Sequence, residues 1–515
     1  MALDGTEAQT TFQTLRHSLP NVESLPDFAG RLPYLFDAAE AASVFQFPLP
    51  PAQEVSGLPV QSWAEPDGYR PTLGEGCILG AYTRNGVCIP VRLGAEDRLR
   101  SVYMVGKTGT GKTTALISMI LDDINAGHGV CVIDPHGDLF RAVLGRIPDR
   151  RAEDVVLIDP ADADFPVGLN PLELRGESDR HFIIQEFIGI LARLIEDEFG
   201  QDTLSHFAGP VFFQHVRMGL LLAMSDPTSP GTLLEFYNIF QERGFWERWL
   251  PLKTQDPLLA RWVEHVLPRT NYLSPGSDNL SLGGYVASKF EGFVFDPRLR
   301  NIFAQKHSTI NLSDIIAAGK ILLVNLAKGE LTETNSRFMG MLLLAALQTA
   351  ALSCIRIPEK ERRPFFVYVD EFQSVASQNF VSLVSEGRKF GLGLVLANQF
   401  ISQVRNARIM DSLLGNVGTL IAFRVGPADA EIIEREMRPE VSQSDLLNLP
   451  NHRAYLKALA NGEPARPFVV QTVLPANPAG SDVADRIRTL SRNKYAKPRA
   501  NVEEEITRSL KVTSE

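Results

Sequence analysis

A glycine-rich segment at residues 106–113 constrains the fold of this 515-residue chain more than any other feature. It matches the pattern G-x-x-x-x-G-K-[ST], in which backbone N–H groups and a helix N-terminus surround a phosphate and the lysine neutralises its charge. The segment follows an apolar run, Val102–Val105, and opens a segment of helical composition, Thr113–Asp123, as the pattern requires. We therefore expect ATP and Mg²⁺ as ligands, with the hydroxyl of Thr113 on the metal. The residues predicted to bind the nucleotide are Gly106, Lys107, Thr108, Gly109, Thr110, Gly111, Lys112, Thr113 and Thr114.

A second apolar run supplies the acidic residues that such a site needs. Phe365–Val369 has strand character, and Asp370 and Glu371 follow it directly. Asp370 is predicted to hold Mg²⁺, directly or through water, and Glu371 to polarise the water that attacks the γ-phosphate. Acids also end strands without any catalytic role. The phosphate-binding loop at residues 106–113 (the P-loop) lies in the same domain and favours the catalytic interpretation.

Three further side chains are candidates for catalysis. Gln399 follows the apolar strand segment Leu392–Ala397, where an amide can sense the γ-phosphate or orient water. The alternative is an ordinary amide at the end of a strand. Arg388 and Arg424 are each predicted to complete the site of a neighbouring subunit, as arginines do in other P-loop motors. The alternative for each is a solvated surface charge.

A histidine also lies near a predicted strand end. Asp134-Pro135-His136-Gly137-Asp138 follows the apolar run Gly129–Ile133, and the carboxyl edge of a parallel sheet is where ligands bind. A single histidine beside proline and glycine is nevertheless more typical of a turn than of a ligand. We expect no metal there.

The order of strand and helix patterns indicates an α/β chain with an insertion. Between residues 102 and 174, apolar strand runs alternate with helical segments, which is typical of a parallel sheet covered by helices. Residues 177–306 carry helical periodicity without strand runs, and strand patterns resume at residue 320. Lys112 and Asp370 lie 258 positions apart, far more than a compact P-loop domain needs, which also predicts an inserted helical domain.

The chain before the P-loop differs in character. Residues 76–94 alternate weakly around Asn85-Gly86, a dipeptide that suits a two-residue hairpin turn, so we expect two antiparallel strands. The predicted division is a Pro-rich N-terminal arm (1–75), the first part of the α/β domain with its leading hairpin (76–176), the all-α insertion (177–306), the second part of the α/β domain (307–475) and a basic, helical C-terminal tail (476–515).

Composition excludes several classes of protein. With 44% hydrophobic and 22% charged residues, the chain is globular rather than disordered or collagen-like. Four scattered cysteines without a CxxC spacing fit a reducing cytoplasm and disfavour structural zinc. The longest apolar run, Phe338–Leu347, is about half of the roughly 20 residues that a spanning helix needs, and the N-terminus lacks a signal peptide. We expect a cytoplasmic protein with no intrinsic membrane span, peripheral to the inner membrane only through partners.

Charge bears on the choice of partner. The formal net charge of −10 gives no global basic signature for nucleic acid, but a motor can still grip DNA in one local channel. Arg405 and Arg408 are candidate DNA contacts, with a solvated helix face as the alternative. A basic stretch near the C-terminus is equally open to contact with DNA or an acidic partner and to a solvated tail; it comprises Arg486, Arg488, Arg492, Lys494, Lys497 and Arg499.

In combination, these motifs resemble those of the HerA/FtsK superfamily of ring-forming ATPases, and within it the TraG/TraD type IV secretion coupling proteins and their soluble HerA-like relatives. The resembling segments are Val105–Thr113, Ile133–Leu139, Asn170-Pro171-Leu172-Glu173, Val369–Phe372, Gly387–Gly391 and Ala397-Asn398-Gln399. The resemblance implies a RecA-like domain, a homo-oligomeric ring of hexameric type and ATP-driven movement of DNA through a central channel. It also implies the roles given above for Lys112, Thr113, Asp370, Glu371 and Gln399, with Arg388 as the arginine donated in trans. Coupling proteins usually carry N-terminal transmembrane helices, where this chain has its Pro-rich arm.

Three functions are consistent with these features. The first is an ATP-dependent DNA translocase of conjugation or a related type IV secretion-like DNA transfer, with a relaxase as a possible partner. The second is a secretion-apparatus ATPase that energises protein or pilus export without touching DNA. The third is a HerA-like ring that scaffolds a nuclease partner in defence. Stimulation of ATP hydrolysis by DNA would separate the first from the second.

Overall fold

The computed structural model describes residues 76–511, apart from residues 85–86, 175–178, 200–208, 243, 253–255, 271–281, 377–379, 405–406, 461 and 474–479. The predicted arm (1–75), the predicted turn at Asn85-Gly86 and the candidate DNA contact Arg405 lie outside the described residues, as does the side chain of Arg408.

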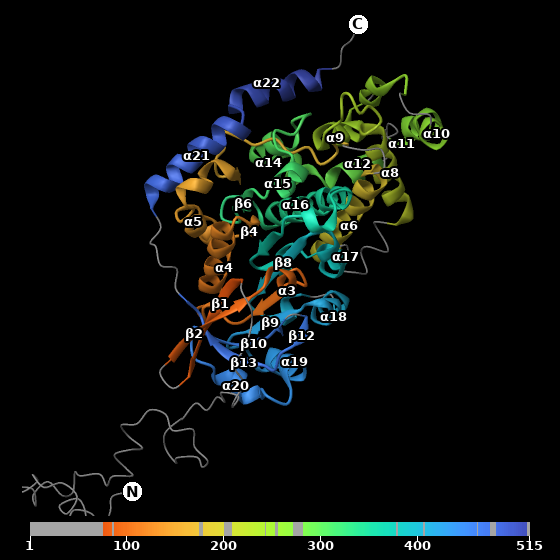
Figure 1. Cartoon of the computed structure of the whole chain (residues 1–515). Helices are drawn as coiled ribbons and strands as arrows, with labels where there is room; N and C mark the ends of the chain where they lie inside the picture. The colour runs from red at the N-terminus through yellow and green to blue at the C-terminus, as the bar shows by residue number, and fades with distance from the viewer. Residues whose placement is uncertain are drawn as a thin grey trace, which may run out of the picture. The chain divides into compact units, whose positions relative to one another are not determined.

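One large mixed sheet organises the described chain (Figure 1). Its strand order is β2-β1-β13-β10-β9-β3-β8-β7-β4-β6-β5. The strands from β9 to β5 are parallel, whereas β10, β13, β1 and β2 continue the sheet in antiparallel fashion. Their bounds are β1 Cys77–Arg84, β2 Val87–Leu93, β3 Val102–Val105, β4 Gly129–Asp134, β5 Val155–Ile158, β6 Ile321–Asn325, β7 Phe365–Val369, β8 Leu392–Asn398, β9 Thr419–Ala422, β10 Arg453–Lys457 and β13 Phe468–Gln471; a small separate pair joins β11 Leu459–Ala460 to β12 Glu463–Pro464.

The α/β class and the helical insertion are confirmed, but the leading hairpin is not a separate element. β1 pairs with β13, so the hairpin extends the main sheet. Sequence patterns could not predict this pairing, because Ala81 and its partner Gln471 lie far apart in the chain. The central parallel strands are buried throughout their length, which explains why their sequences are continuous apolar runs rather than alternating ones.

Helices α4 (Lys112–Ala126), α5 (Asp138–Leu144) and α21 (Ser481–Tyr495) share one hydrophobic core with alternate residues of the strands. Met104, Val132 and Tyr368, for example, point from three strands into this core. Helices α4 and α5 each begin at the carboxyl edge of the sheet, where the strand before them, β3 or β4, ends. Figure 1 shows α4, α5 and α21 together beside the sheet.

The described residues of 177–306 form helices and no strand, as the sequence predicts. The helices are α6 (Asp179–Phe199), α8 (Pro210–Ala223), α9 (Leu233–Gln241), α10 (Pro257–His265), α11 (Leu267–Thr270), α12 (Leu282–Ser288), α13 (Glu291–Phe295) and α14 (Pro297–Phe303). Phe187 of α6 stacks on Phe290 at 5.7 Å between ring centroids and meets Phe338 of α16 (Glu333–Ser353) at 6.0 Å. The insertion thus shares its aromatic core with α16, a helix that follows β6.

Helix α16 is the one described helix that is long and apolar enough to cross a membrane. Of its most apolar window, 67% is buried inside the protein. It packs against α6 and against α15 (Leu312–Ala317), and Gly340 lies close to the side chains of Val375 and Leu326. These contacts are those of a core helix.

The basic stretch near the C-terminus is engaged with the chain itself. Helix α21 packs along β5, and α22 (Arg499–Leu510) buries Val502 and Ile506 and contacts α14. Arg492 forms two hydrogen bonds with Asp162, at 2.7 and 2.8 Å. The other five basic side chains bond to Asp149, Asp159, the carbonyl of Glu153, Glu505 and Glu503.

Candidate nucleotide-binding site

The P-loop connects β3 to α4 at the carboxyl edge of the sheet and is tied to both neighbouring strands. The N–H of Gly106 donates to the carbonyl of Asn398, at the end of β8, and the N–H of Lys107 donates to the carbonyl of Arg424, just beyond β9. Gly111 adopts a φ of +115°, and a Cβ there would lie 3.1 Å from His452. Only glycine fits this position, so the sequence pattern has a direct steric reason.

Lys112 is buried at the start of α4, with its ammonium turned into the loop. Its Nζ donates to the carbonyl of Gly106 and, at 3.1 Å, to that of Lys107. Burial lowers the pKa of Lys112, while the charges of Asp370 and Glu371 act in the opposite direction. A bound phosphate would replace the carbonyls as partner of the ammonium and restore its preference for the charged form.

The remaining P-loop residues divide into two groups. The hydroxyl of Thr110 donates to the carbonyl of Lys107 at 2.6 Å and is buried, so it braces the loop. Thr108, Gly109 and Thr113 are exposed, which leaves the hydroxyls of the two threonines open to a nucleotide and its metal. Thr114 is half-buried in the first turn of α4.

Two acids follow β7, as predicted, and they differ in their surroundings. The carboxylate of Asp370 accepts the N–H of Glu371 at 3.0 Å. Burial, together with the nearby charge of Asp134, raises the pKa of Asp370 to about 6. A hard divalent cation prefers oxygen ligands and would favour the ionised carboxylate, so Asp370 fits Mg²⁺, with the hydroxyl of Thr113 as a second ligand from the chain.

Glu371 lies at the centre of a chain of four polar side chains. The hydroxyl of Thr108 donates to Gln399 Oε1 at 3.0 Å, and Gln399 Nε2 donates to Glu371 Oε1 at 2.7 Å. The other carboxylate oxygen, Oε2, lies 3.1 Å from His136 Nε2. These side chains come from the ends of β3, β8, β7 and β4, which are neighbours in this order in the sheet. The chain links the phosphate-binding loop to the predicted base.

The two predicted trans arginines lie at different edges. Arg424 follows β9 near the P-loop, but its guanidinium donates to the carbonyl of Leu449 at 3.3 Å and to Asn451 Oδ1 at 2.7 Å. Arg388 is exposed in the short helix η8 (Gly387–Phe390), which precedes β8 and therefore lies at the opposite, amino edge. Neither guanidinium is bonded to the predicted nucleotide residues of its own chain, and the trans role of each stays a prediction.

Sequence reasoning missed two histidines at this site. The sequence favours a turn residue at His136, yet its ring contacts Glu371. The N–H of His452 donates to the carbonyl of Thr110 at 2.7 Å and so fixes the P-loop from the antiparallel part of the sheet. The position of His136 at a strand end was the available signal for the first. No signal in the sequence marks the second, because the contact depends on how β10 joins the sheet.

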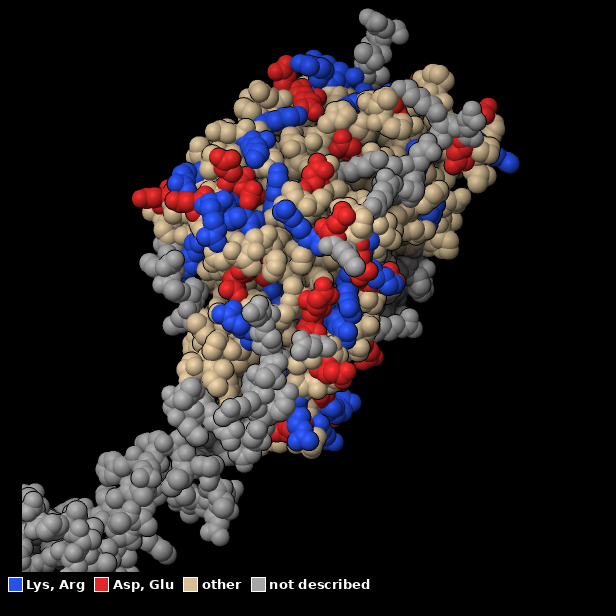
Figure 2. All heavy atoms as spheres, in the orientation of Figure 1, with Lys and Arg blue, Asp and Glu red and all other residues tan. Residues whose placement is uncertain are grey.

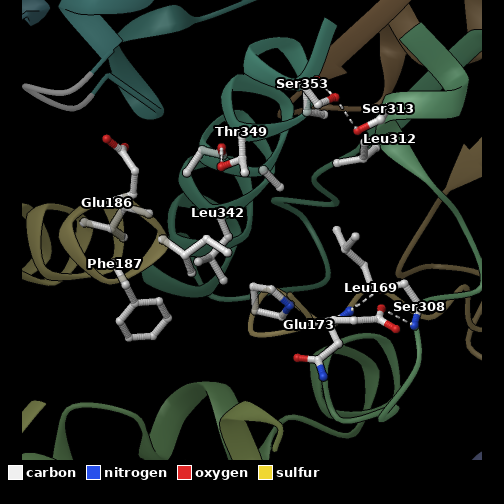
Figure 3. A pocket seen from close by; sticks show the side chains of 17 residues that line it. Leu169, Glu173, Glu186, Phe187, Ser308, Leu312, Ser313, Leu342, Thr349 and Ser353 are labelled. Carbon is white, nitrogen blue, oxygen red and sulfur yellow. Dashed lines mark hydrogen bonds between the residues drawn. The ribbon is translucent and has the colours of Figure 1, made fainter. Parts of the chain in front are cut away.

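A well-formed pocket lies elsewhere, between α6, α15 and α16 (Figure 3). Its walls are mostly apolar, and among the described residues that line it none is a lysine or arginine. Glu173 at its rim accepts the N–H of Ser308 at 2.9 Å and lies 3.1 Å from His307 Nδ1. The described lining offers no cation to neutralise a triphosphate, so the P-loop stays the predicted nucleotide site.

Family models match two segments of this chain. A family model described as Helicase HerA, central domain, matches residues 78–185, which contain the P-loop and His136. A second, described as Type IV secretion-system coupling protein DNA-binding domain, matches residues 315–434, which contain Asp370, Glu371 and Gln399. The type 4 coupling protein DotL of Legionella pneumophila is 22% identical over 359 residues. That match covers 61% of this chain and 45% of DotL, so the chain spans about half the length of this relative.

Solved structures of low sequence identity share the fold. The plasmid coupling protein TrwB in complex with the ATP analogue ADPNP has a TM-score of 0.54 at 15% identity, covering 82% of this chain and 99% of that chain. TrwB in complex with ADP and Mg²⁺ has a TM-score of 0.53 at 16% identity, covering 80% and 93%. VirB4 of Thermoanaerobacter pseudethanolicus has a TM-score of 0.51 at 15% identity, covering 78% and 97%.

The matched segments make this chain similar to P-loop ATPases of the HerA/FtsK type, and its fold is that of TrwB, an α/β structure with a RecA-type sheet and a helical insert. It is related to the type IV secretion coupling proteins, represented by TrwB and DotL, and to VirB4. The family resemblance inferred from the motifs is confirmed.

Proposed function

We propose that this protein binds ATP with Mg²⁺ at the P-loop and hydrolyses it. The observation that carries the proposal is the hydrogen-bonded chain from Thr108 through Gln399 to Glu371. It places a phosphate-loop hydroxyl, an amide and a carboxylate in one site, although 291 positions separate Thr108 from Gln399. An amide between a phosphate loop and a carboxylate can report whether a γ-phosphate is present.

The roles of the residues follow from their positions. Lys112 neutralises the β- and γ-phosphates, and Thr113 and Asp370 hold Mg²⁺, which supplies further charge neutralisation when bound. Glu371 accepts a proton from the attacking water, and Gln399 orients that water. An arginine from the neighbouring subunit, Arg388 or Arg424, stabilises the charge that develops on the transferred phosphate.

We further propose that hydrolysis moves DNA through the central channel of a homo-hexameric ring, in conjugative or type IV secretion-like transfer. The matches to a coupling-protein DNA-binding domain and to DotL support this proposal. Partners of the ring would be a relaxase or other components of the transfer apparatus. The protein would work in the cytoplasm, at the inner membrane only through such partners.

Electrostatics set a condition on this function. The net charge is −10, and Figure 2 shows Lys and Arg interspersed with Asp and Glu over the face drawn. Such a surface does not attract DNA uniformly. Binding should therefore depend on ring formation, which brings channel-facing lysines and arginines of several subunits together, and it should weaken steeply with salt.

VirB4 provides a second candidate function. Its TM-score of 0.51 is close to that of TrwB, so fold similarity alone does not separate a DNA motor from an ATPase of the secretion apparatus. In the second case hydrolysis would energise export and would not respond to DNA.

The test is ATP hydrolysis by the assembled wild-type protein with and without single- and double-stranded DNA, at low and at physiological salt. The DNA motor predicts hydrolysis that DNA stimulates and that salt weakens. A Glu371→Gln variant controls for contaminating ATPase. Hydrolysis that ignores DNA at low salt would overturn the motor in favour of the secretion ATPase, and no hydrolysis above the control would overturn the enzyme itself.

A further inference from the structure

The loop after β4 holds His136 in one place. The carboxylate of Asp134 accepts the N–H of His136 at 2.9 Å and that of Phe140 at 2.8 Å, so it caps the turn and the start of α5 together. Gly137 has a φ of +80°, and a Cβ there would lie 3.0 Å from Asn325 Oδ1. The backbone that carries the imidazole is thus fixed by β4 and by its neighbour β6.

Glu371 has an unusual backbone conformation. Its φ is +46°, in the left-handed region that non-glycine residues seldom adopt. Each of its carboxylate oxygens has one side-chain partner: Gln399 from β8 donates a hydrogen bond to Oε1, and His136 Nε2, after β4, lies 3.1 Å from Oε2.

The two supports are not equivalent. Gln399 also accepts a hydrogen bond from Thr108, an exposed residue of the P-loop, so a phosphate that enters the loop would compete for this contact. The polar contacts of His136 join it to Asp134 and Glu371, and to none of the described P-loop residues. When Gln399 turns to the nucleotide, His136 is the support that stays.

We propose that His136 is a positioning residue for Glu371: its Nε2, 3.1 Å from Oε2, donates a hydrogen to the carboxylate and holds it where it meets the attacking water. This inference rests on the proposed ATP hydrolysis. The opposing interpretation is a surface pair without consequence, since the imidazole is 48% exposed and exposed pairs contribute little. The pair differs from an ordinary surface pair in that its partner is 14% exposed and anchored from a second strand.

The test compares His136→Ala with His136→Gln in steady-state ATP hydrolysis, ATP binding and thermal unfolding. Misplacement of a catalytic group can cost about a hundredfold in rate, so we expect His136→Ala to lower kcat by roughly tenfold to a hundredfold. The KM for ATP, the affinity for ATP and the unfolding midpoint should stay at wild-type values. His136→Gln should restore part of kcat, because its amide can donate to the same oxygen.

The chain offers a matched control. His307 lies 3.1 Å from Glu173, the same distance as the His136–Glu371 pair, and is also exposed. His307→Ala should leave kcat unchanged. A wild-type kcat in His136→Ala, or an equal loss in His307→Ala, would overturn the positioning role while ATP hydrolysis stands. A wild-type protein without hydrolysis would overturn the proposed function, and the inference with it.

Discussion

The two edges of the parallel sheet carry polar networks of opposite character, although they share strand β7 and helix α4. At the amino edge, Arg98 and Asp123 are fully buried and bond through two contacts, at 2.6 and 2.7 Å. Tyr368 of β7 and His128 add one hydrogen bond to each carboxylate oxygen of Asp123. At the carboxyl edge, Glu371 and His136 are partly exposed.

The charge states of the two networks differ as well. Burial alone would raise the pKa of Asp123, but the charge and hydrogen bonds of Arg98 lower it below its usual range. Asp370, at the other end of β7, has no such partner, and its pKa is raised to about 6. At the amino edge the buried carboxylate has a charged partner. At the carboxyl edge the buried carboxylate of Asp370 would be stabilised by a cation. This difference suits the first network to holding the fold and the second to the proposed hydrolysis of ATP.

The largest effect in this comparison is expected on ATP hydrolysis, from Arg388, an exposed residue at the amino edge. Because arginines supplied in trans contribute about 10³-fold or more to turnover, Arg388→Ala should reduce hydrolysis by that order and leave ATP binding intact. Mixing Arg388→Ala with Lys112→Ala protein should restore part of the activity, since some interfaces then combine an intact P-loop with an intact arginine.

If rings that contain both variants are shown to form and yet recover no ATP hydrolysis, that result would count against a shared site. A monomeric protein at saturating ATP and DNA would count against it more strongly, because no neighbouring subunit could then donate Arg388.

The next effect is on stability. Asp123→Asn leaves the guanidinium of Arg98 buried without its charged partner, which should cost about 3–5 kcal/mol in the free energy of unfolding. Asp138→Asn, at an exposed pair with Arg141, is the control and should cost less than about 1 kcal/mol. Denaturant unfolding measures both, and equal losses would mean that the amino-edge network is not the structural one.

The same pair also predicts a pH dependence. Because folding lowers the pKa of Asp123, its stabilising contribution is present above the ordinary carboxyl range and is lost as the pH falls through it. Wild type should therefore lose stability on acidification by more than Asp123→Asn does. Parallel stability curves for the two proteins would contradict this assignment.

The smallest effect is expected from the basic stretch. Arg492 is 37% exposed and pairs with Asp162, so Arg492→Ala should lower the free energy of unfolding by no more than about 1 kcal/mol. DNA stimulation and its dependence on salt should be unchanged, because the charge is already paired within the chain. A reduced salt slope in DNA binding would show that this stretch faces DNA after all.

Sequence alone predicts the chemistry-bearing ends of β3, β7 and β8, because each follows an apolar run that can only be a buried strand. Lys112, Asp370, Glu371 and Gln399 were placed in this way. The sequence alone could not predict that β4 pairs with β7. Without that pairing, His136 is only a turn histidine. The contact between Arg98 and Tyr368 spans 270 positions and is equally invisible. Patterns along the chain specify elements, whereas neighbours in the sheet decide which side chains meet.

The central claim is that ATP is hydrolysed at the carboxyl edge of the sheet. Lys112 acts there on the phosphates and Glu371 acts on water. Its most direct test is to measure ATP binding and hydrolysis side by side in Lys112→Ala and Glu371→Gln, with thermal unfolding as a check on folding. Lys112→Ala should lose turnover and bind ATP weakly, whereas Glu371→Gln should bind ATP like wild type and fail to hydrolyse it. Hydrolysis by Glu371→Gln at the wild-type rate would contradict the account.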